Sequence, residues 1–300
     1  MRDVIIHEVG PRDGLQAEKQ VVPTERKLGW IRALVAAGVD IVQVGSFVHP
    51  EKVPQMADTD ALFRALSAEP HGRTVLSGLV LNERGLERGV ACGVEMFCLG
   101  VSASETHSRK NTGMGSEEAE RRIIDMARAA VAAGRKVQVS VQSAFGCGFE
   151  GAISEDRVVD LVQAYLDAGL NNVSLADTAG HAHPAQVRRL FGRIRALAGP
   201  EARFTCHFHD TYGLGMANIF AALESGVTSF ETSFAGLGGC PFTKVAAGNV
   251  ATEDFVHALR RSGARQEVDL AGLIAVGREV AAYFDREMPG RVHRTGPLPY

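Results

Sequence analysis

The chain has 300 residues, of which 45% are hydrophobic and 22% charged, and its formal net charge is −3. This apolar content suffices for one large α/β domain or two smaller ones, and the weakly acidic charge argues against nucleic acid or an acidic membrane as a partner. The five cysteines lack paired spacing, which predicts free thiols in a reducing cytoplasm. No apolar run is long enough to span a membrane, and a strand-like run begins too early for a signal peptide. We therefore expect a cytoplasmic protein.

A repeated unit runs along the chain, formed by a short β-branched run, a loop and an amphipathic segment that ends near glycine. Strand-like runs occupy 4–9, 40–46, 74–80, 94–101, 136–143, 172–177, 204–210 and 229–236. Helical segments alternate with them, near 24–37, 58–68, 84–92, 116–133, 154–168, 184–197, 215–225 and 249–262.

Strict alternation of strands and helices predicts a parallel sheet, and eight repeats of about 30 residues favour a (β/α)8 TIM barrel over an open doubly wound sheet. A dinucleotide-binding fold would need GxGxxG after a strand, and the "GLGG" at 236–239 does not have that spacing. An extra C-terminal helix is expected near 268–284. We expect one catalytic barrel over residues 1–285 and a loosely ordered C-terminal tail over 286–300.

Polar residues stand near the ends of six of the expected strands. In TIM barrels the functional side chains lie at the carboxyl ends of the strands and in the loops that follow. All of these residues should therefore meet at one mouth, which is stronger evidence for a site than any single motif. They are Arg12, Asp13, Gln43, Ser46, Ser140, Gln142, Ser174, Asp177, His207, His209, Asp210, Cys240 and Asn249.

The stretch "FTCHFHD" (204–210) contains two histidines with strand alternation. Alternation places His207 and His209 inside the barrel, with Phe204, Cys206 and Phe208 toward the helices. Taken alone, such a pair is more often a hydrogen-bonded part of a polar core. Carboxylate and amide oxygens from other strands favour instead a mixed nitrogen and oxygen site for Mg²⁺ or Mn²⁺. A structural zinc site would use a cysteine cluster, which is absent from the sequence.

Cys240 stands in the glycine-rich loop "GLGGCP" (236–241), which can bring a thiol over the mouth of the barrel. A thiol near a divalent cation can exchange a proton at moderate pH. Cys147, in "FGCGFEG", has a similar setting with weaker support, and we interpret Cys92, Cys98 and Cys206 as buried apolar residues.

Several segments together resemble the hydroxymethylglutaryl-CoA lyases, part of a wider group of metal-dependent barrels that includes isopropylmalate synthases. They are "EVGPRDGLQAEK" (8–19), "GSFVHPEKVPQM" (45–56), "SLADTAG" (174–180), "CHFHDTYGLGMAN" (206–218) and "AGLGGCPF" with "AAGNVATED" (within 235–254). The resemblance covers essentially the whole chain in the same order. It implies a divalent-metal-dependent carbon–carbon lyase that cleaves a 3-hydroxy-3-methyl acyl-CoA to acetyl-CoA and a keto acid such as acetoacetate.

The resemblance also implies roles for individual residues. The implied ligands of Mg²⁺ or Mn²⁺ are Asp13, His207, His209 and Asn249. Arg12 is expected to stabilise the enolate oxygen and Cys240 to transfer a proton, while Asp13 and His207 are candidates for the base. Contacts to substrate or CoA are implied for Arg12, Gln16, Lys19, Gln43, Ser46, Ser174 and Asp177. For Arg109 and Lys110 in the loop at 102–111, contact with the CoA phosphates and a solvated surface loop are equal alternatives. The expected partners are a small-molecule acyl-CoA and a second copy of the chain.

Gln43 departs from the family's pattern, in which a glutamate stands on the second strand. Loss of that charge beside Arg12 and the metal suggests a related substrate such as citramalyl-CoA, or a weakened lyase, and tolerated drift is the alternative. A Claisen-type synthase of the wider group would usually be longer. An aldolase for a hydroxy-oxo acid would not depend on CoA, and a non-catalytic metal-binding barrel would be marked by loss of a ligand.

Overall fold

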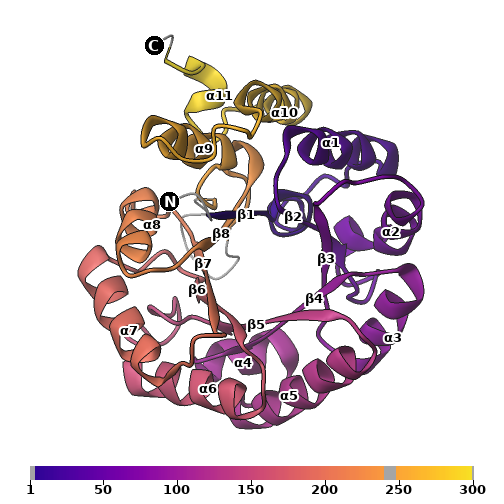
Figure 1. The fold of residues 1–300 in the computed structure, drawn as a ribbon. Coiled ribbons are helices and arrows are strands. Elements are labelled where there is room, and N and C mark those ends of the chain that lie inside the picture. The colour runs from indigo at the N-terminus through magenta and orange to yellow at the C-terminus, as the bar shows by residue number, and fades with distance from the viewer. Residues whose placement is uncertain (1–3, 240–247, 299–300) are drawn as a thin grey trace.

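The chain folds into a closed barrel of eight parallel strands, in a computed structural model that describes residues 4–239 and 248–298 (Figure 1). The strands follow one another around the barrel in chain order, and β1 pairs with both β2 and β8. The predicted (β/α)8 barrel is thereby confirmed. The strands are β1 (Ile5–Glu8), β2 (Ile41–Ser46), β3 (Val75–Leu79), β4 (Met96–Ser102), β5 (Lys136–Gln142), β6 (Asn172–Asp177), β7 (Arg203–Phe208) and β8 (Ser229–Thr232).

Helices surround the barrel on its outer side (Figure 1). They are α1 (Thr24–Ala37), α2 (Thr59–Ser67), α3 (Glu83–Cys92), α4 (Glu105–Thr112), α5 (Ser116–Ala132), α6 (Glu155–Asp167), α7 (Pro184–Leu197), α8 (Gly215–Glu224), α9 (Thr252–Arg261), α10 (Leu270–Phe284) and α11 (Val292–Thr295). Over residues 4–239 and 248–298, none of these helices combines the length and the apolar character that crossing a membrane requires.

Helix ends follow the local chemistry of the sequence. Gly38 adopts φ 86° directly after α1, and its N–H bonds to the carbonyls of Leu34 and Val35, a conformation that favours glycine. The helix α4 lies where we expected a loop. Ser104 caps this helix by accepting a hydrogen bond from the N–H of His107. Because α4 is short and almost entirely polar, it carries no apolar periodicity by which it could be recognised.

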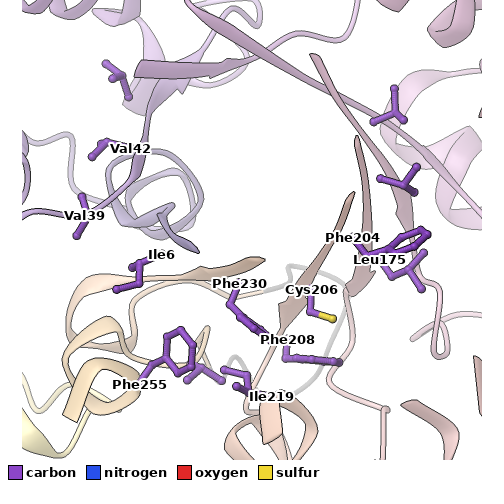
Figure 2. Close-up of a cluster of buried hydrophobic side chains, with 14 of the residues drawn as sticks. Ile6, Val39, Val42, Leu175, Phe204, Cys206, Phe208, Ile219, Phe230 and Phe255 are labelled. Atoms are coloured by element: carbon purple, nitrogen blue, oxygen red, sulfur yellow. The ribbon is translucent and has the colours of Figure 1, made fainter. Parts of the chain in front are cut away.

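The hydrophobic core lies between the outer face of the strands and the surrounding helices. Figure 2 shows Phe204, Cys206 and Phe208 of β7 on this outer side, as strand alternation predicted. Phe230 of β8 packs on Phe255 of α9 with ring centroids 5.3 Å apart. Since the apolar side chains of β7 face the helices, their polar neighbours in sequence are left to face the barrel interior.

The chain after α10 packs against the barrel. Within α11, the buried His293 lies with its Nδ1 3.1 Å from Oε1 of Glu253, which is also buried. The N–H of Gly290 donates to the carbonyl of Ala235 at 2.9 Å, and the side chain of Asp254 accepts from the N–H of Arg291 at 3.0 Å. These contacts hold the stretch from Gly290 to His293, within the expected tail, against the barrel.

Candidate active site

The carboxyl ends of the strands open into a cavity of 790 Å³. Polar side chains from the first, second, fifth, sixth, seventh and eighth strands or the loops after them reach it, so residues far apart in sequence meet at one mouth. Those of the predicted site residues that line the cavity are Arg12, Asp13, Gln16, Lys19, Gln43, Ser140, Gln142, Ser174, His207 and His209.

A single π-helical turn after β1, η1 (Gly10–Gly14), presents Arg12 and Asp13 to the cavity. Nη1 of Arg12 donates to Oδ1 of Asp13 at 2.7 Å, and Nε of Arg12 donates to Oε1 of Gln43 on β2. Burial alone would raise the pKa of Asp13, but the adjacent Arg12 charge and the nearby histidines hold that pKa well below its ordinary value. Asp13 is therefore a fixed anion, and Arg12 is a cation oriented by two acceptors.

Three ligand-type side chains converge beside this pair. One ligand atom from each of Asp13, His207 and His209 lies within 4.8 Å of the other two. The Nε2 atoms of the two histidines are 3.0 Å apart, and Nε2 of His207 lies 3.9 Å from Oδ2 of Asp13. Two imidazole nitrogens and a carboxylate this close repel one another unless a proton or a cation lies between them, so the donor set suits a divalent ion.

Asn249 completes the cluster from the far end of the chain. Its Nδ2 donates to Oδ2 of Asp13 at 2.8 Å and to the carbonyl of Leu237 at 3.0 Å. Its Oδ1 is buried and has no hydrogen-bond partner among the described residues. A buried amide oxygen without a partner is costly unless something else binds it. The orientation of Asn249 therefore fits a side chain that gives its oxygen to a metal ion.

Glu231 on β8 is a functional candidate that the sequence analysis missed. Its carboxylate accepts a hydrogen bond from Nδ1 of His207 at 2.8 Å and another from Nε2 of Gln138 at 2.5 Å. Burial would raise the pKa of Glu231, but the bond to His207 and the surrounding positive charge lower it to about 2. A signal was present in the sequence: strand alternation places Phe230 outward, so the neighbouring Glu231 must point into the barrel.

Two predicted contact residues, Ser46 and Asp177, do not line the cavity. The carboxylate of Asp177 accepts from the N–H groups of His181 at 2.8 Å and Ala182 at 3.1 Å, so it orders the turn after β6. Burial raises the pKa of Asp177 to about 7. The backbone of Ser46 is bonded to the hydroxyl of Thr59. The side chain of Asp177 therefore supports the backbone of its own loop, whereas the hydroxyl of Ser46 is buried with no hydrogen-bond partner among the described residues.

The mouth of the cavity carries exposed cations near the first loop and the end of α10. Lys19 is exposed and lines the mouth, as does Arg286, which is paired with Glu18. Phe284 adds an apolar wall.

The other two cations proposed for CoA lie away from the lining of the cavity. Arg109 is exposed and pairs with Glu105 one helical turn earlier, at 2.7 Å. Nζ of Lys110 lies 4.6 Å from the ring centroid of Phe149. Their neighbours His107 and Asn111 line the cavity instead.

Cys240, the expected loop thiol, lies outside the described residues. Gly238 and Gly239, which precede it, line the cavity. The other four cysteines are buried, as expected for Cys92, Cys98 and Cys206. Sγ of Cys147 lies 3.1 Å from the hydroxyl of Ser104, the cap of α4, so this thiol has a structural partner.

Comparison with known proteins places these features in a family. The HMGL-like family model matches residues 3–280. The hydroxymethylglutaryl-CoA lyase of Bacillus subtilis is 35% identical over 97% of this chain and 96% of its own length. The (R)-citramalyl-CoA lyase of Chloroflexus aurantiacus is 37% identical over 99% of this chain and 96% of its own. The solved structure of a lyase from Acinetobacter baumannii with coenzyme A and 3-methylmalate superposes with a TM-score of 0.93, at 36% identity, over 99% of this chain and 96% of that chain. This chain belongs to the HMGL-like family.

Proposed function

We propose that the protein is a divalent-metal-dependent carbon–carbon lyase that cleaves hydroxymethylglutaryl-CoA to acetyl-CoA and acetoacetate. The convergence of Asp13, His207 and His209 beside the cation of Arg12, in the lining of a cavity of 790 Å³, carries this proposal. Asn249 joins them through its bond to Asp13. The full-length similarity to hydroxymethylglutaryl-CoA lyases supports the substrate class.

The metal, Mg²⁺ or Mn²⁺, would be held by Asp13, His207, His209 and the amide oxygen of Asn249. Such an ion supplies Lewis acidity, which lowers the pKa of a hydroxyl group and orients the substrate. Oxygen and imidazole ligands suit these hard or borderline ions, and the partnerless Oδ1 of Asn249 is consistent with this assignment.

Cleavage begins with loss of the proton from the tertiary hydroxyl of the substrate. The resulting alkoxide becomes a ketone as the neighbouring carbon–carbon bond breaks, and the bonding electrons pass into the thioester as an enolate. Arg12 is the cation for the developing enolate oxygen, since Asp13 and Gln43 hold its guanidinium in place before the reaction. A preorganised charge of this kind lowers the barrier because it needs no rearrangement in the transition state.

The hydrogen bonds and pKa values of Asp13 and His207 limit which residue can act as the base. Asp13 is bonded to Arg12 and Asn249, and its depressed pKa makes it a weak base. In the metal-free site, the bond to Glu231 and the charge of Asp13 overcome the effect of burial and raise the pKa of His207. Once Nε2 of His207 binds the metal and Nδ1 donates to Glu231, however, the ring has no lone pair left to accept a proton, so we assign neither residue as the base. Cys240 is proposed to protonate the enolate carbon, which yields acetyl-CoA.

The CoA portion of the substrate is proposed to lie across the mouth. Lys19 and Arg286 offer positive charge for phosphate groups there, and Gln16 offers an amide. Gln43 and Ser174 line the interior of the cavity and are proposed to contact the acyl portion. Assembly into a homodimer remains a proposal from the sequence.

A second candidate substrate is citramalyl-CoA. Gln43 is a neutral acceptor for the guanidinium of Arg12, and the (R)-citramalyl-CoA lyase of Chloroflexus aurantiacus is as similar to this chain as the hydroxymethylglutaryl-CoA lyases are. Without a second carboxylate beside Arg12, the cavity can tolerate a shorter acyl chain that brings its own carboxylate closer to this cation.

Product identification tests the function directly. The purified protein is incubated with hydroxymethylglutaryl-CoA or citramalyl-CoA, with Mg²⁺ or with EDTA, and the products are identified by mass spectrometry. We expect acetyl-CoA and acetoacetate from the first substrate, or acetyl-CoA and pyruvate from the second, only when metal is present. Absence of acetyl-CoA from both substrates at saturating Mg²⁺ would refute the proposal.

A further inference from the structure

Glu231 stands at the centre of a row of side chains that crosses three strands. In the barrel register, His207 of β7 is the partner of Glu231 on β8, and Glu231 is the partner of His7 on β1. All three side chains are buried. The carboxylate therefore lies between two imidazoles inside the barrel, and only one of them, His207, belongs to the metal cluster.

The carboxylate is held from the other strands as well. Oε1 of Glu231 accepts from Nε2 of Gln138 on β5 at 2.5 Å and from the hydroxyl of Ser174 on β6 at 3.4 Å. On the far side, Nδ1 of His7 lies 3.7 Å from the same oxygen, and Nε2 of His7 is 3.0 Å from the hydroxyl of Ser77. These contacts leave Oε2 directed at His207, so the position of this oxygen is determined by several strands.

The contact between Glu231 and His207 determines which nitrogen of the imidazole carries a proton. An ionised carboxylate can only accept hydrogen bonds, so Nδ1 of His207 at 2.8 Å must be the donor. In the neutral ring, Nε2 then keeps its lone pair. This atom faces Nε2 of His209 at 3.0 Å and Oδ2 of Asp13 at 3.9 Å. The lone pair is thus presented where a ligand atom is required.

We infer that Glu231 is the positioning residue of the metal site: it holds His207 in the tautomer and orientation that bind the ion through Nε2. This inference rests on the metal-dependent function proposed above. A carboxylate on the outer nitrogen of a ligating histidine fixes the ring and increases its basicity, and loss of such a partner typically costs about 10- to 100-fold in metal affinity. Gln138 and Ser174 support Glu231 and do not themselves reach the cluster.

Two substitutions test separately the hydrogen bond between Glu231 and His207 and the negative charge of Glu231. Glu231→Gln keeps the shape of the side chain and removes its charge, whereas Glu231→Asp keeps the charge and withdraws it by one methylene. We expect both variants to bind Mn²⁺ more weakly than the unsubstituted protein, by about 10-fold or more. Asp40→Asn is the matched control for stability, because Asp40 bonds to the N–H of Ile6 and to Arg265 at the opposite end of the barrel.

Two measurements test these expectations, one of Mn²⁺ affinity and one of the tautomer of His207. Electron paramagnetic resonance titration gives the Mn²⁺ affinity, and long-range ¹H–¹⁵N spectra of the metal-free protein at pH 8.5 report the tautomer of His207. The spectra are assigned with a His207→Gln variant. We expect the Nδ1–H form in the unsubstituted protein and in Asp40→Asn, with a shift toward Nε2–H in Glu231→Gln.

The inference is overturned if Glu231→Gln keeps both the affinity for Mn²⁺ and the Nδ1–H tautomer. Wild-type affinity in Glu231→Asp would overturn the role of the contact, because charge alone would then suffice. Failure of the proposed function looks different: the unsubstituted protein would not bind Mn²⁺, while the metal-free spectra would still show whether Glu231 sets the tautomer of His207.

Discussion

Nδ2 of Asn249 donates to Oδ2 of Asp13 at 2.8 Å, although 236 positions separate the two residues in the chain. This contact joins the loop after the first strand to the loop after the last one, at the point where the barrel closes. It also determines the orientation of the Asn249 amide. Because Nδ2 donates to Asp13, Oδ1 is the atom available to bind a metal ion.

Replacement of Asn249 by alanine should therefore weaken metal binding without unfolding the protein. Removal of the amide takes away one oxygen ligand and the bond to Asp13, and we expect Mn²⁺ affinity to fall by about 10- to 100-fold. Calorimetric titration with Mn²⁺ measures the change. An affinity equal to that of the unsubstituted protein would exclude Asn249 from the ligand set.

Substitution of Arg12 by glutamine should affect turnover more than binding. The guanidinium is proposed to act on charge that exists only in the transition state, so kcat should fall by about 100- to 1000-fold with a smaller change in KM. Steady-state kinetics at saturating Mg²⁺ measures both constants, and Mn²⁺ affinity serves as the control for an intact site. A large rise in KM with unchanged kcat would instead assign Arg12 to ground-state binding.

Gln43→Glu tests the meaning of the neutral residue on β2. A carboxylate there would pair with Arg12 and repel a substrate carboxylate placed near it, so selectivity should move toward hydroxymethylglutaryl-CoA and away from citramalyl-CoA. The ratio of kcat/KM for the two substrates is the measurement, and a change of about 10-fold or more is expected. Equal hydroxymethylglutaryl-CoA cleavage by both proteins, with no better substrate for the unsubstituted one, would mean that Gln43 is a tolerated substitution without effect on substrate choice.

Glu8 should make stability depend on pH. Burial raises the pKa of this carboxyl from 4.5 to about 8, against the opposing effect of hydrogen bonds from Thr252 and two backbone N–H groups. Because the folded-state pKa is the higher one, the stability from Glu8 is fully present below about pH 4.5 and is lost as pH rises toward 8.

Glutamine at position 8 resembles the protonated acid, so Glu8→Gln should lose less stability than the unsubstituted protein between pH 5 and pH 8.5. Urea denaturation at both pH values measures the difference. Parallel pH dependence in the two proteins would contradict a protonated Glu8 in the folded state.

His293→Ala tests how firmly the C-terminal segment belongs to the barrel. The substitution removes a partner of the buried Glu253, which should cost about 1–3 kcal/mol in the free energy of unfolding. Arg294→Ala is the matched control, since Arg294 pairs with Glu287 at the surface and should change stability by less than about 1 kcal/mol. Equal stability of both variants would show that this segment contributes little to the fold.

The barrel could be predicted because its signals are local. Alternation in β7 assigned Phe204 to the core and His207 to the interior, and the glycine after α1 ended that helix where φ becomes positive. The helix α4 was missed for the opposite reason: its first residues are capped by Ser104, but it presents no apolar face along its length.

The supporting contacts of the site were not predictable in the same way. Glu231 could be assigned to the interior by alternation, but its partners Gln138 and His7 come from strands distant in sequence that meet only when the barrel closes. Asp177 stood at a strand end like the cavity residues, yet its carboxylate turns back to the N–H groups of its own loop. Spacing along one strand cannot distinguish these two outcomes.

The backbone pairing between His209 and Asn249 fixes one flank of residues 240–247. The two residues form an isolated β-bridge, and the N–H of Asp210 donates to the carbonyl of Gly248 at 2.9 Å. On the other side, the carbonyl of Leu237 accepts a hydrogen bond from Nδ2 of Asn249 at 3.0 Å. Both flanks of residues 240–247 are thus anchored to the frame of the barrel. Because these contacts lie outside residues 240–247, substitutions within that segment should leave Asn249 in register with the other proposed ligands.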